Sequence, residues 1–171
     1  SSSIFTHIER DPGCYKRSHD FLRPMSNSYK HALVMFDRVG CGQESERRET
    51  IEGIVENNLS VSGWGDRAAA VVIDPELEVW VWSDSPAVAS CLGWEPGMSD
   101  LRNWLTARGL WPKYGRKPVD PKRAVEQVLR QVRKPRSSGI YKLLAQRVSF
   151  ERCTDPAFLK FKAVMQKWFG R

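Results

Sequence analysis

Two continuous runs of apolar residues, 32–36 and 68–73, stand out from the mixed polar and apolar pattern of the rest of the chain. A continuous run is typical of a strand that is buried on both faces of a sheet. Between the runs, the apolar positions of residues 44–59 recur at helical spacing. A strand, a helix of about 15 residues and a second strand make a βαβ unit, so we expect a partly parallel sheet.

The remaining pattern predicts mostly helices. Residues 4–9 alternate weakly and indicate a short strand that ends at the turn signal of residues 11–13. Residues 18–29 indicate a helix interrupted near Pro24. Beyond Trp82 we expect helices at 85–92, 98–109, 121–134, 137–147 and 155–169. The predicted fold class is α/β, a single domain 1–171 with a core at 4–84 and a helical part at 85–171.

The stretch VVIDPELEVWVW, residues 71–82, holds three carboxylates between two apolar runs. Asp before Pro is a strong helix-start signal, because the Asp side chain caps free N–H groups and Pro suits the first helical position. The same pair stands at Asp120 and Asp155, each ahead of a helical pattern. Capping therefore explains Asp74 and Glu76, although metal binding remains the alternative.

Capping does not explain Glu78, which is flanked by apolar side chains. Asp37 ends the first predicted strand, and the carboxyl ends of parallel strands face one crevice, where ligands usually bind. Asp37, Asp74, Glu76 and Glu78 would then form a cluster of oxygen ligands suited to Mg²⁺ or Mn²⁺. If Glu78 instead pairs with an arginine, the metal hypothesis loses its central residue.

The charge is distributed unevenly along the chain. Residues 1–107 hold 10 basic and 16 acidic side chains, whereas residues 108–171 hold 17 basic and 4 acidic ones. Such asymmetry indicates a polyanionic partner, most plausibly nucleic acid, although a solvated basic helical face is the alternative. The candidates for phosphate contacts are Lys117, Arg133, Lys134 and Arg136, interleaved with aromatic residues that stack on unpaired bases when exposed.

The composition argues against several other classes. With 41% hydrophobic residues the chain is expected to fold, and no apolar run approaches the roughly 18 residues of a membrane span. The four cysteines form no CxxC and the three histidines supply no zinc spacing, so no zinc is expected. These features, and the lack of a recognisable leader, favour a reduced cytoplasmic protein without a membrane partner.

The acidic stretches resemble a known family. HALVMFD, residues 31–37, resembles the strand that ends in the DxD motif of Toprim-like domains. IDPELEVWVW resembles the NP-x-FE-x-W-L-L segment of the RloB-like branch, which is related to the Toprim domains of OLD-family nucleases. Over residues 4–169 the chain is similar to small bacterial proteins of methylation-associated phage-defence systems, on strings that stand here as DPGC, FDRVGCGQE, DRAAAVVIDPELEVWVWSDSP, KPRSSGIY and DPAF.

The resemblance implies a Toprim-like sheet with Mg²⁺ or Mn²⁺ at the strand ends, Asp37 and Glu78 as catalytic acids, and nucleic acid and other defence proteins as partners. The second acid of DxD falls on Val39, a departure that Glu44 or Glu49 could offset, with Glu44 as the third catalytic candidate. The glutamate that usually follows the first Toprim strand would fall before Ser1. Two hypotheses therefore stand: a Mg-dependent nuclease or phosphotransfer enzyme, and a non-catalytic docking subunit.

Overall fold

A computed structural model describes residues 2–83, 85–149, 151 and 153–170. The chain forms two compact units. The first, the α/β unit, comprises Ser1–Glu76 and Pro156–Arg171, and the second, the helical unit, comprises Leu77–Asp155. The chain leaves the α/β unit after Glu76 and returns to it at Pro156, so the helical unit is an insertion within it.

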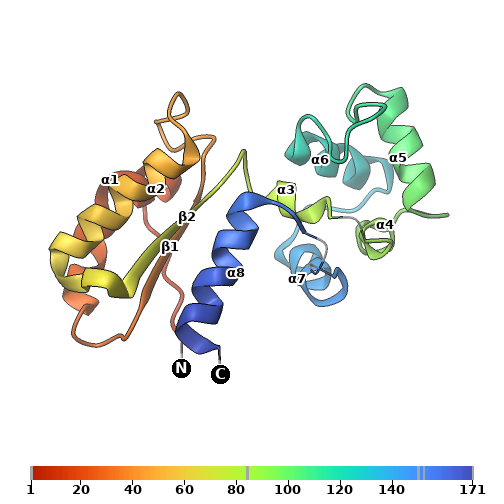
Figure 1. The fold of residues 1–171 in the computed structure, drawn as a ribbon. Coiled ribbons are helices and arrows are strands. Elements are labelled where there is room, and N and C mark those ends of the chain that lie inside the picture. Colours follow the sequence, from red (N-terminus) through yellow and green to blue (C-terminus); the bar gives the residue numbers. More distant parts are fainter. Residues whose placement is uncertain (1, 84, 150, 152, 171) are drawn as a thin grey trace. The chain divides into compact units, whose positions relative to one another are not determined.

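The α/β unit contains two strands that pair in parallel, with Ala32 opposite Ala68 and Asp37 opposite Ile73. Figure 1 shows β1 and β2 between α1 and α2 on one side and α8 on the other. In chain order its main elements are α1 (Arg10–Leu22), β1 (Ala32–Asp37), α2 (Arg48–Leu59), β2 (Ala68–Ile73) and α8 (Pro156–Phe169). The predicted βαβ unit is thereby confirmed.

The core of the α/β unit lies between the sheet and its first two helices. Alternate residues of β1, beginning with Ala32, point into it, and α2 contributes the buried Ile51 and Val55. The helix α8 packs against β2. Every residue of β2 after Ala68 is buried, which agrees with its continuous apolar sequence. Short 3-10 helices lie at Arg23–Met25 and Gly65–Arg67, and a π-helical segment lies at Ser60–Trp64.

The helical unit packs its helices around a separate apolar core. Trp82 and Trp111 meet edge to face there with ring centroids 5.5 Å apart, and the Trp82 indole N–H donates to the carbonyl oxygen of Pro121. As predicted, Asp120 caps a helix, because its carboxylate accepts the backbone N–H of Arg123 at 2.9 Å. The helices are α3 (Glu78–Val81), α4 (Ala87–Leu92), α5 (Met98–Ala107), α6 (Pro121–Gln131) and α7 (Ser138–Arg147).

Three local predictions were wrong. Residues 4–9 form no strand, and the first helix begins at Arg10 rather than Ser18. Pro12 fits there because the first turn of a helix tolerates proline, and Gly13 fits because a Cβ at this position would collide with the His7 ring. Asp74 does not start a helix, since α3 begins only at Glu78.

The α/β class and the small parallel sheet flanked by helices are confirmed. The four cysteines are free, and three of them are buried. Within the described part of the chain, no helix is both long and apolar enough to cross a membrane.

Candidate functional site

The two strands end at one edge of the sheet, and this edge brings two predicted site residues together. Asp37 is the last residue of β1 and pairs with Ile73, so Asp74 follows directly at the same edge. The backbone N–H of Asp37 donates to the carboxylate of Asp11 at 3.2 Å. Glu76 lies two residues beyond Asp74 and is buried. The strand-end pair therefore consists of Asp37 and Asp74.

Arg38 neutralises one acid of this pair. Its Nε donates to the Asp74 carboxylate at 2.8 Å, and its Nη1 donates to the carbonyl oxygen of Glu44 at 2.6 Å. The side chain is largely buried, with 25% exposed. Arg38 thus ties the segment after β1 to the segment after β2, and Asp74 serves as its counter-ion.

Glu44 folds back onto the loop that follows β1. One of its carboxylate oxygens accepts the N–H of Gly40 at 2.8 Å and that of Gly42 at 3.2 Å. Both glycines have positive φ, which turns their N–H groups toward one acceptor. The backbone N–H groups of Glu44 itself, Gly42 and Gly40 hold the pKa of this carboxyl below its usual value. Glu44 therefore stabilises its own loop.

Glu78 lies in the helical unit and is 2% exposed. Its carboxylate accepts a hydrogen bond from Arg136 Nη2 and another from the Tyr141 hydroxyl at 2.7 Å. The Tyr141 hydroxyl in turn accepts the Nε–H of Arg136 at 2.9 Å, which closes a triangle. Burial, together with the hydrogen bond to Glu78, raises the pKa of Tyr141. Glu78 is an ion-paired anchor, the arrangement that weakens the metal hypothesis.

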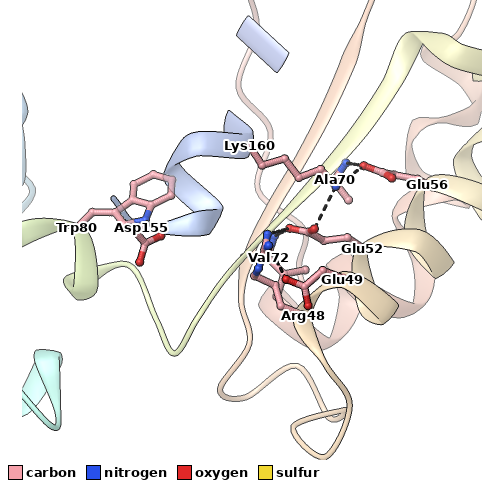
Figure 2. Close-up of polar contacts among 9 residues, drawn as sticks. All are labelled: Arg48, Glu49, Glu52, Glu56, Ala70, Val72, Trp80, Asp155 and Lys160. Carbon is pink, nitrogen blue, oxygen red and sulfur yellow. Dashed lines mark hydrogen bonds and ion pairs between the residues drawn. The ribbon is translucent and has the colours of Figure 1, made fainter. Parts of the chain in front are cut away.

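Lys117 also pairs with an acid of the helical unit. Its Nζ lies 3.5 Å from the carboxylate of Asp155, which accepts the indole N–H of Trp80 at 3.0 Å (Figure 2). Asp155 is 8% exposed, and both of its partners are partly exposed. Because Lys117 neutralises a buried carboxylate, it is less available to a phosphate than the sequence suggested.

The other predicted phosphate contacts differ in their surroundings. Arg133 is exposed and has positive φ just after α6, as in a left-handed helix end. Lys134 is exposed, and its side chain passes over Gly93 at the end of α4. Arg136 is 46% exposed although it binds Glu78. Three of the four candidates thus reach the surface of the helical unit.

Most charged side chains on the surface of this unit are basic. Among its described residues, five acidic side chains are exposed, compared with eleven basic ones. The exposed basic residues are Arg102, Arg108, Lys113, Arg116, Arg123, Arg130, Arg133, Lys134, Arg136, Lys142 and Arg147. Net positive surface charge of this kind attracts phosphate.

The sequence reasoning missed a second acidic cluster, at the outer edge of β2. Glu52 accepts the backbone N–H of Val72 at 2.9 Å, and Glu56 accepts that of Ala70 at 3.0 Å. The Ile73 carbonyl oxygen faces β1, where it accepts the N–H of Arg38, so alternate residues 70 and 72 face away from β1. Two carboxylates one helical turn apart therefore cover N–H groups that a neighbouring strand would otherwise bind.

Cations from two helices balance this cluster. Lys160 of α8 bridges it, with Nζ 3.1 Å from Glu52 and 2.7 Å from Glu56, as Figure 2 shows. Arg48 lies 2.8 Å from Glu52 on the same helix. Glu52 is 3% exposed and stands beside Ile51, so a carboxylate within an apolar helical face was the signal that could have revealed it.

These contacts decide which acids fit a divalent cation. One carboxylate oxygen of Glu78 accepts hydrogen bonds from Arg136 and Tyr141, and one of Glu44 accepts two backbone N–H groups, so these oxygens already have donors. Among the residues that the structure describes, no three His, Cys, Asp or Glu side chains gather as a metal site requires. Comparisons with protein-family models, with curated proteins and with solved structures found no match.

Proposed function

We propose that this protein is a nucleic-acid-binding component of a bacterial phage-defence system and that its helical unit contacts the phosphates. The excess of exposed basic side chains on this unit carries the proposal. The resemblance of its sequence strings to phage-defence proteins supplies the biological setting. Arg133 and Lys134 are the leading phosphate contacts, because both are exposed.

The contacts of the acids favour a non-catalytic subunit over an enzyme. Glu78, the counterpart of the catalytic acid in the RloB-like resemblance, is held by Arg136 and Tyr141. Val39 stands where the second acid of DxD would be. On this proposal the α/β unit keeps a Toprim-like fold without Toprim-like catalysis, and its acids stabilise that fold.

A salt titration tests the proposal. A fluorescent oligonucleotide is titrated with the full chain at several salt concentrations, and the logarithm of the association constant should fall linearly with that of salt. Replacing Arg133 and Lys134 together by Gln should weaken binding about 10-fold and reduce the slope by roughly 0.7–0.9 for each lost phosphate contact. An affinity that is indifferent to salt would contradict the proposal.

A matched control removes the same charge from the α/β unit. Lys16 and Lys30 are exposed there. Their joint replacement by Gln changes the net charge equally but should leave affinity and slope nearly unchanged. Equal losses in both double variants would indicate an effect of net charge alone.

A divalent-metal nuclease or phosphotransfer enzyme is the second candidate, because Asp37 and Asp74 share one sheet edge. Calorimetric titration with Mg²⁺ and Mn²⁺ tests it. On this alternative Asp37→Asn abolishes metal binding together with any metal-dependent cleavage of single-stranded or duplex DNA and RNA. If the full chain binds neither ion, this candidate fails and the proposed binding function is untouched.

A further inference from the structure

Tyr114 is the most exposed large aromatic side chain among the described residues of the helical unit, at 88%. It lies between Lys113 and Arg116, which are both exposed. The Lys113 ammonium is 5.6 Å from the centroid of the Tyr114 ring. An exposed aromatic ring flanked by cations suits an anionic partner that contains flat rings. The cations attract its negative charge, and the ring can stack on its flat rings.

The turn that carries Tyr114 is closed by its own backbone. The N–H of Gly115 donates to the carbonyl oxygen of Pro112 at 3.0 Å, which places Lys113 and Tyr114 at the two central positions. A Cβ at Gly115 would lie only 2.7 Å from the Pro112 ring. Because Gly115 has no Cβ, it can approach the Pro112 ring closely enough to close the turn.

Two side chains anchor the same turn to the unit. The carbonyl oxygen of Gly115 accepts the Arg102 Nη2–H at 2.7 Å and the Trp111 indole N–H at 2.8 Å. Trp111 is 4% exposed and packs on Trp82 in the core. The Arg102 guanidinium also lies 5.3 Å from the centroid of the Trp111 ring. The turn is consequently fixed to buried structure while its tip points into solvent.

We infer that the Tyr114 turn is a stacking site for an unpaired base of single-stranded nucleic acid. The inference rests on the proposed function and adds a substrate class to it. Because the backbone of the turn is already fixed, little backbone entropy is lost when a base stacks on the Tyr114 ring, and the neighbouring cations neutralise the flanking phosphates. Bases of a duplex are already stacked within the helix, so duplex nucleic acid gains little from this ring.

Binding of matched oligonucleotides tests the inference. Single-stranded DNA, single-stranded RNA and duplex DNA of about 20 nucleotides exceed the roughly 4–16 nucleotides covered by known single-strand-binding folds. Tyr114→Ala should weaken binding of the single strands roughly 5- to 150-fold, the range found for loss of one stacked base, and should change duplex binding little. Tyr114→Phe should retain the affinity because it keeps the ring.

Val119→Ala is the matched control, since Val119 is 73% exposed and only a few residues away but has no ring. It should leave all affinities unchanged, and thermal unfolding should show that each variant is folded. Photo-crosslinking to a strand containing 5-iodouracil, followed by mass spectrometry, should place the crosslink on Tyr114. A loss confined to one of the two single strands would identify the sugar that the site accepts.

The outcomes separate the two proposals. If the wild type binds with strong salt dependence but Tyr114→Ala matches it on single strands, or loses duplex affinity equally, the stacking inference is wrong and the proposed function stands. If the wild type binds none of the three probes, both are wrong. Tyr114-dependent capture of a protein, without an effect on single-strand affinity, would also overturn the inference.

Discussion

Acids have different partners in the two units. In the α/β unit, the buried Glu52 and the partly exposed Glu56 accept hydrogen bonds from backbone N–H groups of a strand, in addition to their ion pairs with Lys160. In the helical unit, Glu78 and Asp155 accept hydrogen bonds from side chains that come from distant parts of the sequence. The difference follows from the secondary structure, because a sheet edge leaves N–H groups unpaired whereas the interior of a helix satisfies its own.

The surfaces of the two units differ as well. Among described residues, the exposed side chains of the α/β unit include eight basic and six acidic residues, whereas the helical unit has eleven and five. The asymmetry that the sequence places at residue 108 therefore corresponds in the structure to a unit rather than to a half of the chain. The following predictions test how the charged side chains of each unit stabilise it.

The largest effect is expected at Glu52. Glu52→Ala leaves the Val72 N–H without its acceptor and removes one of the two carboxylates that each of Arg48 and Lys160 contacts, and should lower the free energy of unfolding by about 3 kcal/mol. Urea denaturation measures the change. Glu49→Ala is the control on the same helix, since the Glu49 side chain is 66% exposed, and it should cost less than about 0.5 kcal/mol. If the two variants lost equal free energy of unfolding, the outer edge of β2 would not need the Glu52 carboxylate.

A somewhat smaller effect is expected at Glu78. Glu78→Ala removes the acceptor of Tyr141 and Arg136, and should cost about 2 kcal/mol, because the half-exposed Arg136 can turn to water. Since the partners are side chains, a double-mutant cycle with Tyr141→Phe should give a coupling energy of about 1 kcal/mol. If the costs of the two substitutions were additive, Glu78 and Tyr141 would not interact directly, and this difference between the two units would disappear.

Helix caps of the helical unit give a third test. Asp120→Ala removes a carboxylate that accepts the Arg123 N–H, and should cost about 1 kcal/mol. Ser137 occupies the equivalent position of α7 without a side-chain hydrogen bond there, so Ser137→Ala should cost only a few tenths of a kcal/mol. Urea denaturation of both variants checks the difference, and a larger cost at Ser137 would refute it.

The smallest effect is expected in the Glu44 loop, where backbone N–H groups lower the pKa of the Glu44 carboxyl. Because the folded-state pKa is lowered, the stabilisation is complete above the ordinary glutamate value of about 4.3 and is lost as pH falls through the lower folded value. Amide chemical shifts of Gly40 and Gly42 should titrate together below that value. Glu44→Gln should abolish this titration. A titration midpoint above about pH 4.3 would contradict stabilisation of the Glu44 carboxylate by the N–H groups of Gly40 and Gly42.

The elements were largely predictable, because their signals are local. Continuous apolar runs revealed both strands, and helical spacing revealed the five helices that follow α3. The start of α1 was missed because Pro12 and Gly13 form a turn signal whose meaning depends on His7. Asp74 was misread because Arg38, a residue far away in sequence, claims its carboxylate. A pattern along the chain does not contain such partners.

The candidate sites likewise combine features that the sequence reveals locally with partners that it does not reveal. The sequence marked Glu78 as unusual for its apolar surroundings but did not identify Arg136 and Tyr141 as its partners. Glu52 has the same signal and was overlooked among the other acids of a charged helix. The convergence of Asp37 and Asp74 was predictable, because parallel pairing alone fixes it.

Lys160 has a consequence for the time course of synthesis. It lies in the last helix, yet it completes an ion-pair cluster whose acids lie on α2. During translation from the N-terminus, the entire helical unit leaves the ribosome before Lys160 does. The inserted unit therefore has the opportunity to fold first, and the ion-pair cluster of the α/β unit is completed only after α8 has been synthesised.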